Sequence, residues 1–432
     1  MAKKKIIVLG AGLSGLSAAW HLQEKGIGCQ VFEKESTAGG LCRSKNIEGF
    51  TFDYDGHLLH FRQEYAFNLV KSLLGNNLAE HKRSAWIYFD GAYTRYPFQA
   101  NLYGLSPVVV KECVLGFIEA NKNGYVDTKN GLDFLNWIKR TFGEGIARHF
   151  MIPYNKKFWT VPPQELNCGW LDGFIPVPSL KEVIEGTVEE NQRQFGYNAL
   201  FWYPKKGGIA QLSTALAGKI KNLNYNCRIT GIDLDKKEIK IASGQREKFD
   251  YLVSTIPLPE LPSLTSGLPD RVFSLFAKLK WNSIFNLNLG VDKKENCGRH
   301  WVYFPHKEAC FFRVGFFHNF SPDLAPQDKG SLYVEVSYSK DKPIDRKTIV
   351  ARIKKELKKV GILRQNDVIC AQDINDIKYG YPIYDKNYRG AREKILEFLS
   401  AKNIITCGRY GSWRYMSMED ALLDGRNVAE KL

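Results

Sequence analysis

The sequence lacks the features that a zinc protein, a disulfide-stabilised protein or a membrane-spanning protein would need. Its nine cysteines include no C-x-x-C pair, so neither a zinc site nor a disulfide framework is expected, and a reducing compartment suits such thiols. The chain has no uncharged apolar run of transmembrane length, no low-complexity tract and no repeat of solenoid period. The apolar stretch at the N-terminus is interrupted by Gly10, Gly12 and Gly15, and no cleavage site follows it, so we expect no signal peptide.

Acidic residues are also in deficit. The 46 aspartates and glutamates face 61 lysines and arginines, which gives a formal net charge of +15 over 432 residues. Such a charge suits nucleic acid, a membrane surface or an anionic small molecule. Because the basic residues are scattered and form no recognised nucleic-acid module, we expect no nucleic-acid partner. Peripheral contact with a membrane and the oligomeric state stay open, and the length predicts about two or three domains.

The N-terminal segment has the pattern of a dinucleotide-binding βαβ unit. An apolar strand at residues 6–9 leads into a G-x-G-x-x-G turn formed by Gly10, Gly12 and Gly15. These glycines provide the tight turn, the close approach of a pyrophosphate and the close packing of helix on sheet. The helix N-terminus that follows attracts phosphate. Glu33 ends the second strand, where an acid binds ribose hydroxyls, so the unit predicts binding of NAD or FAD.

The residues that follow this unit favour FAD over NAD. The segment STAGGLCRS places Gly39, Gly40 and Arg43 directly after the acidic residue. This arrangement resembles flavoproteins of the amine oxidase and protoporphyrinogen oxidase superfamily, in which the segment covers the pyrophosphate and the flavin. The segment EKFDYLVSTIPLPEL, at 247–261, resembles the strand that returns to the flavin domain in these proteins. The resemblance implies FAD as the cofactor.

The rest of the chain predicts two inserts within a discontinuous flavin domain. Apolar residues recur at three- and four-residue spacing between about residues 102 and 196, which indicates helices. Residues 285–336 contain aromatic-rich segments typical of an antiparallel sheet, and residues 235–237 mark a hairpin. We therefore expect an α/β fold. Its predicted parts are a Rossmann-type FAD-binding domain of residues 1–98, 205–262 and 394–432, a mainly helical substrate domain of residues 99–204, and an antiparallel β-sheet substrate domain of residues 263–393.

Several segments carry a more specific resemblance, in order along the chain. They are YPFQANL from 96, FMIPYNKKFWTVPPQELNCGWL from 150, FGYNALFWYPKKGG from 195, WVYFPHKEACFFRVGFFHNFSP from 301, YGYPIYD from 379 and GRYGSWRY from 408. Together they resemble the UDP-galactopyranose mutases, particularly the eukaryotic type. The resemblance implies an isomerase, a flavin-dependent intramolecular transferase acting on a nucleotide-diphosphate sugar. It also implies a role in making galactofuranose for cell-surface polysaccharides, and a cytoplasmic location.

The chemistry implied by this resemblance uses the cofactor as a nucleophile. N5 of reduced FAD attacks the anomeric carbon, UDP leaves, and the sugar recloses in the other ring size with no net redox change. The flavin must first be reduced, so an external reductant such as NAD(P)H belongs to the expectation. A departing diphosphate needs cationic and phenolic partners. The family pattern gives this role to Arg313, Tyr381 and Tyr415, and places His57 beside the flavin, where it helps to hold the reduced state.

The same resemblance assigns further side chains to the substrate and to the cofactor. The expected substrate-binding residues are Tyr96, Gln99, Asn155, Trp159, Asn198, Trp301 and Tyr303, together with Arg313, Tyr381 and Tyr415. The expected cofactor-binding residues are Gly10, Gly12, Gly15, Glu33, Gly39, Gly40, Arg43, Gly56, His57, Arg409, Ser417 and Met418. Core packing is the alternative explanation for each tyrosine taken singly. An ion pair or an edge position is the alternative for Arg313, and a structural role is the alternative for His57. No metal site is expected.

The C-terminal segment joins a helix start to this expected site. Residues 417–420, SMED, fit the acidic form of a capping box, so the last helix is predicted to begin at Ser417. In this superfamily the N-terminus of that helix points at the pyrimidine edge of the flavin, where a positive dipole end favours the anionic reduced form. Arg409 and Tyr415 lie in the turn before it.

Two residues depart from the family pattern and leave the substrate open. Phe174 stands where the family has a second diphosphate arginine, which is expected to weaken diphosphate binding. Glu419 stands where the eukaryotic type has asparagine. It is expected to bring negative charge near the flavin or the sugar, and to mark where the substrate differs from UDP-galactose. The alternative function is a FAD-dependent oxidoreductase of the amine oxidase or protoporphyrinogen oxidase type. The sugar, the nucleotide and the net redox change stay open.

Overall fold

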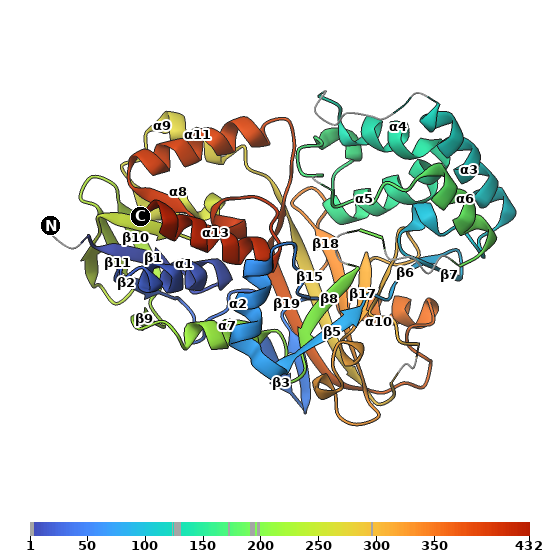
Figure 1. The fold of residues 1–432 in the computed structure, drawn as a ribbon, viewed down its shortest axis with the longest axis horizontal. Coiled ribbons are helices and arrows are strands. Elements are labelled where there is room, and N and C mark those ends of the chain that lie inside the picture. Colours follow the sequence, from blue (N-terminus) through green and yellow to red (C-terminus); the bar gives the residue numbers. More distant parts are fainter. Residues whose placement is uncertain are drawn as a thin grey trace.

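A parallel sheet assembled from distant parts of the chain forms one half of the molecule (Figure 1). The computed structural model describes residues 4–122, 124, 131–171, 173–190, 195–196, 199–294 and 297–432. The strand order is β20-β13-β1-β2-β9, and every neighbouring pair is parallel. The bounds are β1 (Ile6–Leu9), β2 (Cys29–Phe32), β9 (Leu223–Asn224), β13 (Tyr251–Ser254) and β20 (Ile404–Thr406). The expected α/β class and the return of the 247–261 segment to the first strand are therefore confirmed.

Helices cover this sheet because its strands are apolar on both faces. α1 (Leu13–Glu24) and α13 (Met418–Lys431) lie side by side against it. They can approach closely at Gly425, where a Cβ atom would lie 2.6 Å from the amide nitrogen of Ala18. The other helices of this half are α2 (Glu64–Leu74), α7 (Ala210–Ala217), α8 (Leu261–Leu264), α9 (Asp270–Phe276), α11 (Tyr388–Ala401) and α12 (Gly408–Gly411).

A larger, mixed sheet forms the second layer and is antiparallel except for one pair. Its order is β19-β15-β18-β17-β16-β6-β7, and only β16 and β6 run parallel. The bounds are β6 (Ala85–Phe89), β7 (Ala92–Arg95), β15 (Trp281–Val291), β16 (Trp301–Tyr303), β17 (Arg313–Phe316), β18 (Gly330–Tyr338) and β19 (Ile369–Pro382). The expected antiparallel strands between 285 and 336 are thus present. α10 (Ile349–Lys359) packs its apolar side on this sheet.

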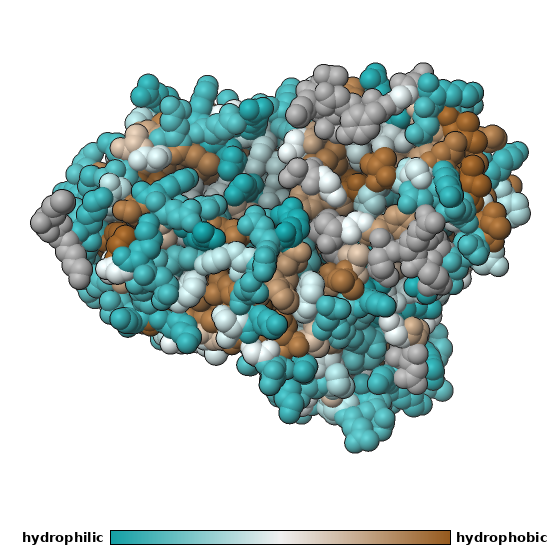
Figure 2. Space-filling model, in the orientation of Figure 1, coloured by the Kyte–Doolittle hydropathy of each residue, from teal (hydrophilic) through white to brown (hydrophobic). Residues whose placement is uncertain are grey.

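Four helices form a third region beside the large sheet (Figure 1). They are α3 (Pro107–Asn121), α4 (Phe134–Ile146), α5 (Ile152–Trp159) and α6 (Leu180–Val188). α3 and α4 pack closely because Gly143 of α4, at φ +76°, sits where a Cβ atom would collide with the carbonyl of Gly116. Figure 2 shows apolar residues gathered on the outer surface of α3 and α6, where Val108, Leu115 and Val188 are exposed.

Shorter elements complete the structure. The expected hairpin is β10 (Ile229–Asp233) with β11 (Glu238–Ile241), extended by β12 (Arg246–Lys248) and β14 (Thr265–Ser266). Two further pairs are β3 (Ser44–Ile47) with β4 (Phe50–Asp53), and β5 (Leu78–Lys82) with β8 (Leu200–Pro204). Within the described ranges, no helix is both long and apolar enough to cross a membrane. The division of the chain into three domains stays a prediction.

His300, directly before β16, makes stability depend on pH. The ring is buried, and its Nδ1 accepts a hydrogen bond from the Ser84 amide at 2.9 Å. Burial, and then the nearby His81, lowers the pKa of His300 to about 4. Because this pKa lies below that of an exposed histidine, the folded state loses stability as the pH falls from about 6.5 towards 4.

We expect His300→Asn to remove the part of the acid sensitivity that comes from His300, because asparagine does not titrate. The fold should tolerate the change, since the asparagine oxygen can accept the same hydrogen bond. The loss of unfolding free energy between about pH 7.5 and pH 5 should shrink by about 2 kcal/mol. Urea denaturation at both pH values measures it. An identical loss in the variant and the parent protein would show that His300 is not a source of the acid sensitivity.

Candidate active site

The turn between β1 and α1 is shaped to admit a dinucleotide. A Cβ atom on Gly10, which has φ +94°, would collide with the Thr255 hydroxyl, and one on Gly15 would collide with the carbonyl of Gly10. Gly12 differs, because its Cβ atom would meet only the Cα atom of Gly40, at 3.9 Å. The first and third glycines are therefore needed for packing. The second glycine leaves open the space through which a pyrophosphate passes in such turns.

The second glycine pair lies directly against this turn. The Gly39 amide donates to the carbonyl of Ala11 at 2.8 Å, and Gly39 is bridged to Gly12. Glu33 is buried at the end of β2, and its carboxylate accepts the amide of Ala11 at 2.7 Å. The expected glycines and the acid are thus brought together at one edge of the parallel sheet.

Arg43 adds an unused donor to the same edge. Its guanidinium lies 4.5 Å from the centre of the Tyr54 ring, and its buried Nε has no hydrogen-bond partner among the described residues. A buried donor without a partner is costly unless a ligand satisfies it. The glycine turn, the acid and this free donor fit the pyrophosphate and ribose of FAD.

The C-terminal helix closes the same region. Ser417 is the N-cap of α13, and its hydroxyl and the Asp420 carboxylate form the expected capping box. The Met418 sulfur lies 3.9 Å from the sulfur of Cys42, next to the second glycine pair. The N-terminus of α13 therefore faces the cradle, and its dipole favours negative charge there.

Glu419 contacts the start of α2 and does not line the cavity described below. The side chain is buried, and its Oε1 accepts the backbone amides of Arg62 at 2.9 Å and Gln63 at 2.7 Å. Gln63 is the N-cap of α2, so the carboxylate satisfies free amides at that helix start. Arg62 adds an ion pair at 3.4 Å. The carboxylate is therefore held by α2, and its expected effect on the flavin or the sugar stays a prediction.

A cavity of about 190 Å³ lies between the helical region and the large sheet. Most expected substrate residues line it, namely Tyr96, Gln99, Asn155, Trp159, Tyr303, Arg313, Tyr381 and Tyr415. Trp301 does not line it but is buried behind Tyr303, with ring centres 6.5 Å apart. Asn198 lies outside the described residues.

The lining also contains residues that the sequence did not single out. They are Phe150, Met151, Tyr154, Phe158, Trp170, Ile175 and Phe312. Three buried polar atoms of the lining have no partner among the described residues: Gln99 Oε1, Trp159 Nε1 and Trp170 Nε1. Aromatic walls with a few unsatisfied polar atoms are typical of a small-molecule site.

Arg313 is the one arginine among the described lining residues, and Glu335 fixes its position. Arg313 begins β17 and pairs across to Glu335 of β18. Nη2 donates to Oε1 at 2.8 Å, and Nε donates to Oε2. Glu335 is fully buried, so the fork-shaped pair holds the guanidinium in one orientation. The sequence carried a weak signal for this partner, an acid inside the apolar strand segment SLYVEVSY.

Arg409 organises the two tyrosines of the cavity. Its guanidinium lies 4.4 Å from the ring centre of Tyr381 and 5.1 Å from that of Tyr415, and it donates to the carbonyl of Gly380 at 2.8 Å. The two tyrosine rings stack with centres 5.9 Å apart. Burial raises the pKa of Tyr381, so this phenol remains a hydrogen-bond donor at neutral pH.

His57 lies near the same cluster, close enough for the charges of Arg409 and Arg313 to act on it. Its Nδ1 lies 3.1 Å from the carbonyl of Asp55. Burial, more than any charge, lowers the pKa of His57, which favours the neutral ring. Gly56 beside it has no room for a Cβ atom, which would collide with the Tyr333 ring.

Phe174 occupies the cavity where the family pattern has an arginine. It lines the wall and packs edge-on against Tyr415, with ring centres 4.8 Å apart. The departure seen in the sequence therefore falls inside the site. One arginine, rather than two, faces any ligand from the described lining.

The cradle and the cavity together define a flavin-binding protein with an adjoining small-molecule site. Residues 13–432 match the family described as flavin containing amine oxidoreductase, and the chain belongs to this family. FAD is the cofactor that membership implies.

The proteins that this chain resembles include enzymes of different kinds. A crystal structure of reduced UDP-galactopyranose mutase has a TM-score of 0.94 and 29% identity, covering 100% of this chain and 94% of that one. "Probable flavin-containing monoamine oxidase A" of Dictyostelium discoideum is 23% identical over 301 residues, 65% of this chain and 63% of its own. Mitochondrial protoporphyrinogen oxidase of Nicotiana tabacum is 46% identical over 50 residues, 12% and 10% of the two chains. The alignments with the monoamine oxidase and the protoporphyrinogen oxidase thus cover less than two thirds of each of those two proteins.

Proposed function

We propose that the protein is a FAD-dependent mutase of nucleotide sugars, of the UDP-galactopyranose/galactofuranose type, working with reduced flavin and no net redox change. The observation that carries this proposal is the cavity. It combines a fixed arginine with two phenols in aromatic walls, and the turn from Arg409 to Ser417 joins it to the cradle. The likeness to a reduced UDP-galactopyranose mutase structure supports the same function.

Each group in the cavity has a part in this proposal. Arg313 binds the diphosphate through charge-assisted hydrogen bonds, and the hydroxyls of Tyr381 and Tyr415 donate to the same group. Asn155 and Trp159 face the sugar, whereas Tyr96, Gln99 and Tyr303 line the nucleotide side. The aromatic walls exclude water, which strengthens these polar contacts. When bound and reduced, the flavin supplies the nucleophile for the anomeric carbon.

The environment of the flavin is part of the proposal. The N-terminus of α13 favours negative charge on the reduced cofactor, and a neutral His57 can hydrogen-bond beside it without adding charge. An external reductant such as NAD(P)H, a cytoplasmic location and a role in cell-surface galactofuranose belong to the same proposal. The identity of the sugar stays open because Phe174 replaces the second arginine.

A second candidate function is a FAD-dependent oxidoreductase. Membership in the amine oxidoreductase family and the similarity to a monoamine oxidase favour it. Hydride removal from an amine or an apolar substrate does not require an arginine in the cavity, whereas a diphosphate does. Because Arg313 lines the cavity, the cavity favours the mutase.

Incubation with UDP-galactofuranose, with and without dithionite, tests the proposal. We expect UDP-galactopyranose to form only after reduction of the flavin, as followed by chromatography of the sugar nucleotides. Failure to convert any sugar nucleotide, together with oxygen-dependent peroxide release on an amine, would favour the oxidoreductase. Boiled enzyme and free FAD with dithionite serve as controls.

A further inference from the structure

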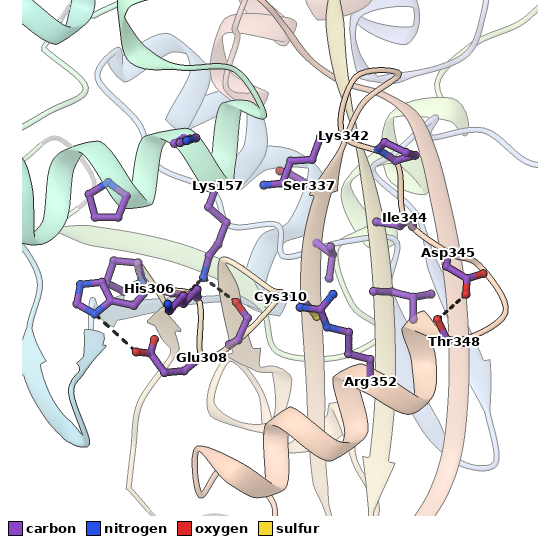
Figure 3. Close-up of a pocket in the computed structure, with 18 residues that line it drawn as sticks. Lys157, His306, Glu308, Cys310, Ser337, Lys342, Ile344, Asp345, Thr348 and Arg352 are labelled. Atoms are coloured by element: carbon purple, nitrogen blue, oxygen red, sulfur yellow. Dashed lines mark hydrogen bonds and ion pairs between the residues drawn. The ribbon is translucent and has the colours of Figure 1, made fainter.

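A second, larger cavity lies on the other side of α5 and belongs to neither the cradle nor the candidate active site. It encloses about 660 Å³ between α5, the loop from β16 to β17, the end of β18 and the start of α10 (Figure 3). Its walls carry apolar side chains, among them Pro153, Pro305, Pro343 and Ile344. This volume is in the range of nucleotide-sized ligands.

The charge of this cavity is unbalanced. Its lining includes Lys156, Lys157, Lys307, Lys342 and Arg352 but only Glu308 and Asp345 as acids. Asp345 is already used, since it accepts the Thr348 hydroxyl at 2.7 Å and the Lys347 amide at 3.0 Å. Glu308 faces His306 at 4.0 Å. Among the described residues, neither of these acids forms an ion pair with a lysine of the lining.

The cations of the lining fall into two groups. Lys157 donates to the backbone carbonyls of Phe304, Ala309 and Phe311, and Arg352 pairs with Glu356 at 2.8 Å, so both have structural partners. Lys156, Lys307 and Lys342 also line the cavity, and none of their side-chain ammonium groups has a hydrogen-bond or ion-pair partner among the described residues. Burial, and then the charge of Lys156, lowers the pKa of Lys342. Both lysines line the cavity, so its lining carries positive charge that no acid of the described lining pairs with.

Ser337 supplies an independent sign of a missing ligand. Its side chain lines the cavity, is 4% exposed, and its hydroxyl has no hydrogen-bond partner among the described residues. Figure 3 shows the Lys342 side chain reaching from the loop after β18 towards Ser337. A buried hydroxyl without a partner is costly, and an anion held by Lys342 would satisfy it.

We propose that this cavity binds the phosphate or diphosphate group of a second small molecule, with Lys342, Lys156 and Ser337 as the anion-binding residues. The apolar walls accommodate the remainder of such a ligand. α5 also gives the site a link to catalysis: Pro153, Lys156 and Lys157 face this cavity, while Asn155, Phe158 and Trp159 line the candidate active site. A ligand that fixes α5 would therefore alter the wall of the active site.

Titration calorimetry of the flavin-loaded protein with inorganic pyrophosphate tests this site. We expect Lys342→Met to weaken pyrophosphate binding at least about tenfold and Ser337→Ala to weaken it by a smaller factor. Lys340→Met is the matched control, because Lys340 lies in the same loop and is also exposed but does not line the cavity, so its removal should leave the affinity unchanged.

Two further measurements separate the site from a structural role and from the active site. Lys342→Met should keep or raise the thermal midpoint, since it removes a repulsion, and should leave UDP affinity unchanged. The proposal is overturned if pyrophosphate does not bind at millimolar concentration, or if Lys340→Met weakens binding as much as Lys342→Met. It is also overturned if Arg313→Ala abolishes binding while Lys342→Met does not, because the anion would then occupy the active site. None of these results depends on which reaction the enzyme performs.

Discussion

Replacing Gly12 by alanine is expected to yield a folded protein that no longer holds flavin. The added methyl group would enter the space that we assign to the pyrophosphate, and overpacking of this kind costs about 3 kcal/mol, or roughly a hundredfold in affinity. The purified variant should therefore lack flavin absorbance in the visible region. Titration with FAD, followed by quenching of flavin fluorescence, measures the remaining affinity.

The neighbouring glycines provide the control for this prediction. Because a Cβ atom on Gly12 meets only the Gly40 Cα atom at 3.9 Å, the fold should tolerate the substitution. Gly15→Ala should instead reduce stability, since its Cβ atom would collide with the Gly10 carbonyl. Retention of a full complement of FAD by Gly12→Ala would place the cofactor elsewhere.

Replacing Arg313 by alanine is expected to have the largest effect on the substrate. Arg313 is the one arginine in the described lining of the cavity, and a buried charge-assisted pair with a diphosphate is worth about 4 kcal/mol, or roughly a thousandfold in affinity. Sugar-nucleotide and UDP affinity should both fall by this factor, while the flavin stays bound. Calorimetry with UDP and the flavin spectrum give the two measurements.

The partner of Arg313 allows folding and binding to be separated. Removal of Arg313 leaves the Glu335 carboxylate buried without its cation, which is expected to cost about 3 kcal/mol of stability. The double variant Arg313→Ala/Glu335→Gln should recover much of this stability but none of the UDP affinity. If the stable double variant bound UDP as tightly as the wild-type protein, Arg313 would not be a substrate-binding residue.

The cradle could be predicted from the sequence because its signals are local. Gly10, Gly12, Gly15 and Glu33 lie within one βαβ unit, and each takes the place that its spacing indicated. The capping box at Ser417 was equally readable, since all its groups lie within one helical turn. The geometry of such short motifs is set by residues that are close together in the sequence, so it can be predicted without knowing the tertiary fold.

Contacts between distant segments could not be predicted in this way. Glu419 accepts a hydrogen bond from the start of α2, 356 residues away along the chain, and no local sequence pattern predicts such a partner. The pairing of β16 with β6, and of Arg313 with Glu335 across neighbouring strands, likewise depends on sheet register. Family resemblance found most of the cavity lining, whereas the partners that hold those residues came only from the structure.

The most direct test of the central claim is the number of electrons consumed for each sugar nucleotide converted. The flavin is reduced once with stoichiometric dithionite under anaerobic conditions, and UDP-galactofuranose is added in large excess. We predict many turnovers per reduced flavin, with the flavin spectrum still reduced at the end. Formation of at most one product per flavin, with the flavin reoxidised by the substrate, would contradict catalysis without net redox change.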